Sequence, residues 1–160
     1  MGARFETKGV GIRFSSEFEW VKTIDNKGNQ TNIFAAGEPI IVELGFRINK
    51  EVRNLEFGVG VLDMPRLAGL FTESSPIHSS SVNEGSYCVR MKIDPNYLRE
   101  GYYSLALNMF ADGIRQDTLN DTLKFTVFSD KNHTDEGRQF TLWQPGPLSF
   151  GYKWERIEPV

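Results

Sequence analysis

The sequence predicts an all-β protein folded as an antiparallel β-sandwich. Stretches of alternating apolar and polar residues recur about every ten to fifteen positions, with turn signals between them. No window has a convincing helical period. In the run 98–107, Leu98 and the turn glycine Gly101 precede Tyr103 and an alternating strand. This pattern is typical of a tyrosine corner, in which a core tyrosine bonds its hydroxyl back to the preceding loop.

The first half of the chain contains two segments with strand periodicity. Residues 9–25 alternate in two pieces, first at Val10, Ile12 and Phe14 and then at Phe18 and Trp20. Turns are predicted at 25–28 and 37–39, and the second places Pro39 just before a strand, where its missing N–H costs no ladder bond. The strand at 40–48 is predicted to bury the face formed by Ile40, Val42, Leu44, Phe46 and Ile48.

The second half continues the pattern. Residues 55–61 place every second side chain in the core, 69–72 form a short strand, and the serine-rich stretch 73–84 is predicted to be a loop. Three further strands have the inward sets Tyr87, Val89, Met91 and Ile93; Tyr103, Leu105, Leu107 and Met109; and Leu123, Phe125 and Val127. Burying each such side chain contributes roughly 1.5–3 kcal/mol, which opposes a register slip by one residue.

The length of 160 residues is most simply one domain with a sound hydrophobic core. We assign residues 1–8 to a disordered or cloning-derived start and 9–129 to the β-sandwich. Residues 130–160 are assigned to a linker and a C-terminal strand or tail. A strand beyond a polar linker can pair with its own sheet or with that of a second copy. The tail therefore has the geometry of a domain swap.

Composition and charge exclude several classes of protein. The net charge of −3 and the pI near 5.5 argue against a nucleic-acid partner, which needs a concentrated basic face. Cys88 is the only cysteine, so no intrachain disulfide forms, in keeping with a reducing compartment. Apolar runs are far shorter than the roughly 20 residues that span a bilayer. We expect a cytoplasmic protein without direct membrane insertion.

Residues that commonly carry chemistry are sparse. Glu17 and Glu19 share one face of a strand, and alternating surface charge explains them without catalysis. His78 and His133 stand in separate polar segments without the spacing of metal ligands. Cys88 has no base near it in the sequence. We therefore expect no enzyme activity, no metal and no cofactor.

A run of motifs in a fixed order resembles a known family. The motifs are Phe34-x-x-Gly37-Glu38-Pro39-Ile40, Phe57-Gly58-Val59-Gly60-Val61-Leu62-Asp63, Gly69-x-Phe71-Thr72, Gly85 before the strand at 87–93, Leu98-x-x-Gly101-x-Tyr103, Phe125-Thr126-Val127, and Gly137 with Trp154. From about Gly9 to Trp154, the chain resembles the C-terminal domain of the ATP-binding subunits of Wzt-type exporters of O-antigen polysaccharide. It differs from that family by an insertion at 144–150 and by the turn at 64–68.

The resemblance implies an immunoglobulin-like sandwich that binds the exported glycan at the cytoplasmic face of the bacterial inner membrane. It implies an ABC transporter as partner, with its ATPase and membrane subunits, and a homodimer that exchanges the terminal strand. No GxxxxGK[ST] phosphate loop occurs in this chain. The resemblance therefore points to a carbohydrate-binding part of lipopolysaccharide biosynthesis that does not bind nucleotide through such a loop.

The candidate binding surface is the outward face of three strands that should be neighbours in such a sandwich. It holds Glu56, Gly58 and Gly60, then Ser104, Ala106, Asn108 and Phe110, then Lys124 and Thr126. Sugars present hydroxyl edges and apolar C–H faces. We therefore expect Glu56, Ser104 and Asn108 to hydrogen-bond sugar hydroxyls and Phe110 to stack on a ring. Lys124 is assigned to an acidic or modified sugar.

Other interpretations stay open at this point. Small residues on a sheet face also allow another copy or the tail to pack there, and periodicity does not show a pocket. The alternative function is a purely structural dimerisation module without glycan binding. A third interpretation is an extracellular immunoglobulin-like adhesion domain. The resemblance favours glycan contact, by analogy of fold rather than from the residues themselves.

Overall fold

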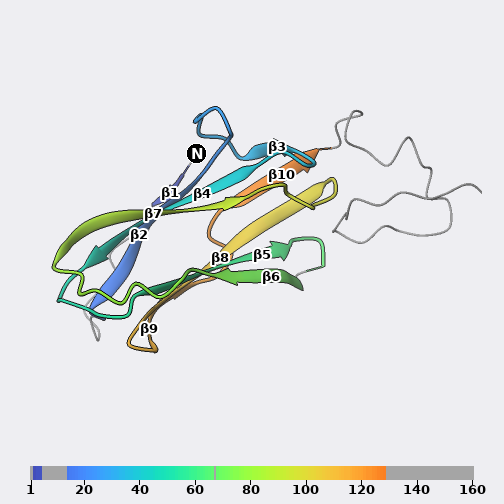
Figure 1. The fold of residues 1–160 in the computed structure, drawn as a ribbon. Coiled ribbons are helices and arrows are strands. Elements are labelled where there is room, and N and C mark those ends of the chain that lie inside the picture. The colour runs from blue at the N-terminus through green and yellow to red at the C-terminus, as the bar shows by residue number, and fades with distance from the viewer. Residues whose placement is uncertain (1, 5–13, 67, 129–160) are drawn as a thin grey trace, which may run out of the picture.

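The computed structural model describes residues 2–4, 14–66 and 68–128 as two packed β-sheets (Figure 1). The first sheet has the order β1 (Ala3–Arg4), β2 (Ser16–Ile24), β4 (Ile40–Ile48) and β7 (Gly85–Ile93), all antiparallel. The second sheet has the order β3 (Ile33–Ala35), β10 (Lys124–Phe128), β8 (Gly101–Ala111), β5 (Glu56–Asp63) and β6 (Ala68–Ser74), and β9 (Ile114–Leu119) pairs with β8. The predicted all-β, immunoglobulin-like sandwich is confirmed. Within the described ranges, no helix is long and apolar enough to cross a membrane.

The core lies between the sheets and is formed by the faces that the alternation predicts. Its most buried members, at most 1% exposed, include Val21, Phe34, Ile40, Val42, Leu44, Val61, Leu105, Leu107, Met109 and Val127. Phe46 of β4 and Phe57 of β5 meet across the sandwich with ring centroids 4.8 Å apart. Because one face of each central strand is buried in this way, a register slip by one residue exposes a whole apolar set.

Tyr103 forms the predicted tyrosine corner near the start of β8. The residue is 1% exposed, and its ring stacks on Phe125 with centroids 5.6 Å apart. Its hydroxyl donates to the carbonyl oxygen of Arg99 at 2.7 Å, four residues back in the connecting loop. Burial, with a smaller contribution from the Asp63 carboxylate, raises the pKa of the Tyr103 hydroxyl to about 12. The hydroxyl therefore remains protonated and able to donate at neutral pH.

Two short strands, β3 and β9, lie in segments for which the alternation predicts nothing. β9 forms a hairpin with β8 through Asp112 and Gly113, whose φ angles are 50° and 72°. β3 pairs in parallel with β10, so the second sheet is not purely antiparallel. The Thr126 amide donates to the Asn32 carbonyl at 2.8 Å, and the Ala36 amide donates to that of Phe128 at 2.9 Å. The second sheet therefore contains two strands that the sequence pattern does not predict.

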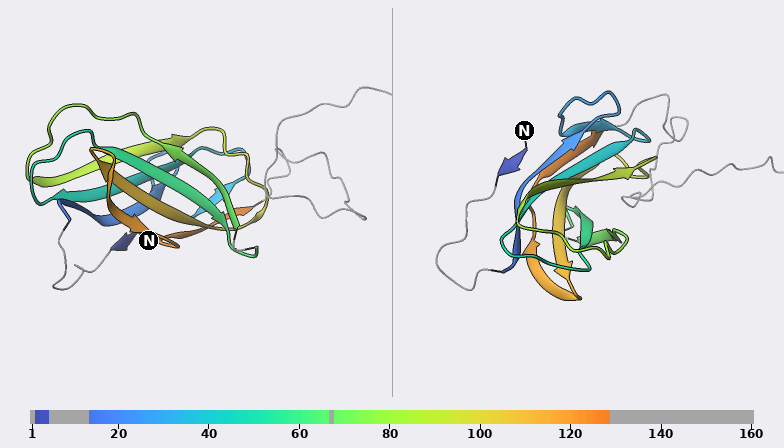
Figure 2. Two further views of the ribbon diagram at one scale, coloured as in Figure 1. Left: turned by 90° about the horizontal axis from the view of Figure 1, so that it is seen from below. Right: turned by 60° about the vertical axis from the view of Figure 1, so that its left-hand side comes forward.

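The two long sides of the sandwich differ, as the further views in Figure 2 help to follow. On one side, Asp117 of β9 is buried, and its carboxylate accepts a hydrogen bond from the Phe18 amide of β2 at 3.0 Å. This bond joins the two sheets. On the other side, the edges are β7 and β6, which have no further neighbour among the described strands. The sandwich is therefore bridged by a hydrogen bond along one side and has two strand edges along the other.

The inward side chains of β7 are less buried than predicted. Tyr87 is 39% exposed, and Val89, Met91 and Ile93 are half-buried. The physical reason is the edge position, because no strand on the outer side of β7 covers these side chains. Cys88 is exposed on the opposite face of β7, as predicted.

Part of the predicted organisation lies outside the described residues. This applies to the alternation at 10–12, to His133, and to the C-terminal strand with its exchange between two copies. Within the predicted disordered start, Ala3 and Arg4 form β1 and pair with β2.

Candidate functional site

The three strands of the predicted binding surface, β5, β8 and β10, are neighbours in the second sheet. Across β5 and β8, Glu56 pairs with Phe110, Gly58 with Asn108, and Gly60 with Ala106; across β8 and β10, Ser104 pairs with Lys124 and Tyr102 with Thr126. Their partners in the alternation, such as Val59, Leu107 and Phe125, are buried in the core. The structure therefore brings the predicted site residues to one side of one sheet, which we call the outer face.

The middle of the outer face is floored by small residues. A Cβ atom added at Gly58 would lie 3.4 Å from Asn108 Cβ and 3.7 Å from Thr72 Cγ2. One added at Gly60 would lie 3.0 Å from Thr72 Oγ1 and 3.6 Å from Ala106 Cβ. The gap above Gly58 is thus about one methyl group wide. The gap is narrow because Thr72 of β6 leans over it.

Asn108 stands beside this gap, and the oxygen of its side-chain amide is hydrogen-bonded. Its Oδ1 accepts a hydrogen bond from the Thr118 hydroxyl of β9 at 3.0 Å. Its Nδ2 group donates no hydrogen bond within the described part of the chain. A bond at the oxygen fixes the orientation of the amide and directs the two N–H donors away from Thr118. The side chain is therefore oriented to donate to an acceptor on the outer face.

Ser104 is placed differently from the prediction. It is 0% exposed, and its hydroxyl donates to the Asp121 carboxylate at 2.6 Å. The Lys124 ammonium lies 3.8 Å from the other oxygen of Asp121. Ser104 thus lies beneath the surface and orients Asp121, whereas Lys124 is exposed. The Ser104 hydroxyl is buried and is therefore not accessible to a ligand on the outer face.

Aromatic rings lie at both ends of the outer face. At one end, Phe110 is half-buried opposite Glu56, and the Arg115 guanidinium of β9 lies 5.9 Å from its ring centroid. At the other end, Tyr102 is 66% exposed opposite Thr126. The ring predicted to stack is therefore partly covered by a cation, and the more accessible ring is one that the sequence analysis did not assign.

The sequence reasoning missed Thr72, Tyr102, Arg115 and Thr118 on this surface. Arg115 and Thr118 belong to β9, whose signal was present in the Asp112-Gly113 pair, because Asp-Gly is typical of a tight hairpin. Tyr102 follows from extending the alternation of β8 by one step towards its start.

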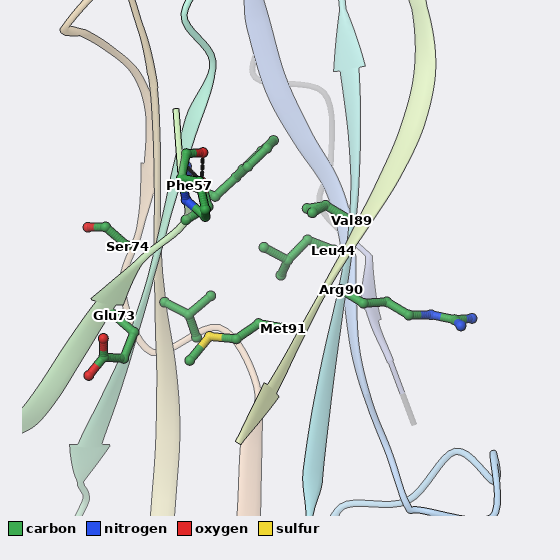
Figure 3. A pocket seen from close by; sticks show the side chains of 10 residues that line it. Leu44, Phe57, Glu73, Ser74, Val89, Arg90 and Met91 are labelled. Atoms are coloured by element: carbon green, nitrogen blue, oxygen red, sulfur yellow. Dashed lines mark hydrogen bonds between the residues drawn. The ribbon is translucent and has the colours of Figure 1, made fainter. Parts of the chain in front are cut away.

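A second hollow lies between the sheets at the β6–β7 side (Figure 3). This pocket has a volume of about 210 Å³ and is lined by Leu44, Phe57, Val59, Val89 and Met91 from the core, with Glu73, Ser74, Ser75, Pro76 and Arg90 around them. Figure 3 shows Met91 and Leu44 directed into the space and Arg90 directed away from it. The hollow is mostly apolar, and its position follows from the two open strand edges.

The solvent-facing side of the first sheet carries ion pairs. Glu43 is 3% exposed, and its carboxylate contacts the Lys22 ammonium at 2.6 Å and accepts a hydrogen bond from Arg90. The hydrogen bond from Lys22 lowers the pKa of Glu43 despite burial, with Arg90 contributing in the same direction. Glu19 accepts from Arg47 at 2.7 Å. These carboxylates are therefore engaged in pairs between strands.

The described residues contain no group of three or more His, Cys, Asp or Glu side chains placed to hold a metal ion. His78 lies in the exposed loop after β6, where its amide pairs with the Leu55 carbonyl at 2.8 Å. The observed geometry thus offers hydrogen-bond donors, a cation and aromatic rings on the outer face, which suit binding of a polar ligand.

Comparison with known proteins identifies the family and the fold of the chain. A family model described as the Wzt C-terminal domain matches residues 14–138. The chain belongs to the Wzt C-terminal domain family. The crystal structure of the C-terminal domain of Wzt superposes with a TM-score of 0.71 at 12% identity, covering 90% of this chain and 85% of that one. The fold of this family member is therefore that of the solved Wzt domain.

Two further solved structures are more distant from this Wzt family member. A CARDB domain from Pyrococcus furiosus in complex with di-metal ions gives a TM-score of 0.44 at 11% identity, covering 77% of this chain and 98% of that one. An alkylpurine DNA glycosylase of Pseudomonas fluorescens gives 0.47 at 10% identity, covering 72% and 31%. Scores this low carry no argument about function. No curated protein matches the chain.

Proposed function

We propose that this chain is a non-catalytic carbohydrate-binding domain that recognises a bacterial O-antigen polysaccharide for export by an ABC transporter. Membership of the Wzt C-terminal domain family supports a role in such a transporter. In that role its partners are the ATPase and membrane subunits, and it acts at the cytoplasmic face of the inner membrane. The sandwich at 9–129 carries the binding surface, and 130–160 supplies the strand that two copies of a homodimer exchange.

The observation that supports the proposal is the composition of the outer face. Gly58, Gly60 and Ala106 leave its centre low, and the Asn108 amide stands beside this centre with its oxygen held by Thr118 and its Nδ2 group near Gly58. Glu56 and Lys124 add an acceptor and a cation. A glycan needs this mixture because hydroxyl groups require hydrogen-bond partners while its C–H faces pack on flat apolar surface.

The narrow, shallow gap at the centre of the outer face predicts weak binding at each site. A shallow surface buries only part of a ligand, and affinity depends on well-packed, desolvated contacts. A dimer presents two such faces to one polymer, so the second contact forms at a high effective concentration. Firm capture of the glycan is therefore expected from the dimer rather than from either copy alone.

The experiment is a titration of the domain with the O-polysaccharide of its own source strain, followed by amide NMR. We expect shifts clustered on residues 56–62 and 104–110. Asn108→Ala should weaken binding several-fold, roughly the loss of one hydrogen bond to a neutral group. Asn49→Ala, an exposed asparagine after β4 in the other sheet, serves as the matched control.

The melting temperature separates binding from folding in this experiment. Asn108→Ala removes the hydrogen bond from Thr118, a net cost of about 0.5–1.5 kcal/mol, so the Tm should move by only a few degrees. An unaltered affinity in a folded Asn108→Ala variant would contradict the assignment of this residue. An absence of shifts anywhere, with the native polymer and folded protein, would contradict the proposed function.

The open side of the sandwich favours a second candidate function, a purely structural dimerisation module. β7 is a nine-residue edge strand, and the apolar pocket beside it is lined by Val89 and Met91. Unpaired edges of this kind are templates for pairing with another chain. This function predicts dimers in sedimentation velocity that persist at low concentration together with no NMR response to the polysaccharide. Monomers throughout the concentration series would refute it.

A further inference from the structure

Tyr102 has the largest exposed fraction, 66%, among the large hydrophobic side chains of the described chain. It directly precedes the buried Tyr103, so its ring stands on the outer face, because side chains alternate along a strand. In register it lies opposite Thr126 of β10, which in turn lies opposite Ile33 of β3. An aromatic ring is thus presented to solvent at the end of β8 that is remote from Phe110.

Polar groups lie next to this ring. Thr126 is its direct cross-strand partner, and Lys124 is its diagonal neighbour on β10. Diagonal neighbours are about 7–8 Å apart, within reach of aromatic and long side chains. Lys124 is 68% exposed, and its 3.8 Å pair with Asp121 is a surface contact that leaves the ammonium accessible. A ring, a hydroxyl and an ammonium are therefore grouped at one place on the sheet.

The two ends of the outer face are far apart. Phe110 and Tyr102 stand on the same strand, eight positions from each other, which is about 26 Å at roughly 3.3 Å per residue. Between them lie the buried Ser104 and then Ala106 and Asn108, the last two beside the glycines of β5. A single sugar ring does not reach from one end to the other, whereas a chain of several units does.

We propose that Tyr102, Thr126 and Lys124 form a second sugar subsite, and that the ligand is a run of several sugar units lying along β8. The inference rests on the proposed glycan-binding function and specifies its substrate class. Tyr102 stacks on the C–H face of one unit, Thr126 hydrogen-bonds a hydroxyl of that unit, and Lys124 meets a carboxylate or other acidic substituent. Asn108 contacts a unit further along the same chain.

A glycan fits this patch better than a protein partner does. Two apolar side chains nearby, Ile33 and Phe128, are 58% and 44% exposed, and on their own they would suit a protein partner. The hydroxyl of Thr126 and the ammonium of Lys124 interrupt that apolar surface, and they match the hydroxyl edge of a sugar. The patch and the low centre both lie on the outer face along β8, separated by the buried Ser104, so a polymer long enough to pass over Ser104 can contact both.

The test uses fragments of the source-strain O-polysaccharide, released by mild acid and fractionated by size, titrated by calorimetry against the full chain. We expect affinity to rise with fragment length up to several units. Tyr102→Ala should remove most of this gain, roughly tenfold for the longest fragment. Tyr102→Phe should retain it because the ring remains. Ile114→Ala, whose parent side chain is 65% exposed, controls for loss of exposed apolar surface.

The outcomes distinguish this inference from the function on which it rests. Equal affinity for short and long fragments, unchanged in Tyr102→Ala, overturns the second subsite and leaves the binding function standing. A Tyr102→Ala variant that self-associates less but binds every fragment normally assigns the patch to a protein contact and also overturns it. Failure of every fragment to bind the folded protein overturns both. Length-dependent binding that requires the Tyr102 ring supports the inference.

Discussion

Gly45 is the most sterically constrained glycine in the first sheet, and its substitution gives a sharp prediction. The Trp20 indole lies over it from the neighbouring strand, after a register irregularity between Phe18 and Trp20. A Cβ added at Gly45 would lie 2.0 Å from Trp20 Cε2, 2.2 Å from Nε1 and 2.6 Å from Cδ2. These distances are far below van der Waals contact, so Gly45→Ala must displace the whole indole from the sheet.

The expected cost follows from that displacement. Overpacking of this kind destabilises a protein by about 1–3 kcal/mol. For a chain of this size each kcal/mol lowers the Tm by roughly 2–4 °C, so Gly45→Ala should lower it by about 2–12 °C. The Trp20→Ala background removes the clash, and there the same substitution should be neutral or stabilising by about 0.4–1 kcal/mol.

A double-mutant cycle in urea, followed by circular dichroism, measures this coupling. Gly58→Ala is the matched control, because its Cβ meets neighbours at 3.4 Å or more and fits without displacement. We expect Gly58→Ala to be neutral or slightly stabilising and Gly45→Ala to be destabilising. If Gly45→Ala lowers the free energy of unfolding by the same amount with Trp20 present and absent, packing of the indole on this glycine is refuted as the cause of the destabilisation.

Two further predictions concern buried polar groups. Tyr103→Phe should cost about 0.5–1.5 kcal/mol at neutral pH, because it removes the hydrogen bond to the Arg99 carbonyl; an unchanged urea midpoint would contradict this. The contacts of Glu43 with Lys22 and Arg90 lower its pKa in the folded protein. The stability that these contacts contribute is therefore fully present above the ordinary glutamate pKa of about 4.3. This stability is lost as the pH falls through the lower pKa of the folded state. Glu43→Gln should therefore be less stable at neutral pH and show a flatter loss of stability in acid; parallel pH curves for the two proteins would disprove this.

The core of the fold follows from the sequence because alternation with period two reports burial directly. The inward sets of β4, β5, β8 and β10 are confirmed, and so is the Tyr103 corner, since a Leu-x-x-Gly-x-Tyr run has a defined geometry. β3 was not predictable in this way. Three residues are too few to show a period, and parallel pairing with β10 depends on tertiary contacts.

The outer face shows where the limits of sequence reasoning lie. The neighbouring strands and their outward residues were predictable from the expected strand order, whereas the register that pairs Gly58 with Asn108 was not predicted. Which of these residues is accessible was not predictable. Burial of Ser104 depends on a loop residue, Asp121, and the covering of Phe110 depends on Arg115 of β9. Accessibility is a property of neighbours distant in sequence, and alternation carries no information about them.

The parallel pairing of β3 with β10 has a mechanical consequence. Where the chain is loaded in opposite directions at Asn32 and at Phe128, the two strands are drawn past each other along their length. The inter-strand bonds, including that from Thr126 to Asn32 and that from Ala36 to Phe128, then bear the load together in shear rather than opening one after another. Separating β3 from β10 under such a load therefore requires several hydrogen bonds to break together.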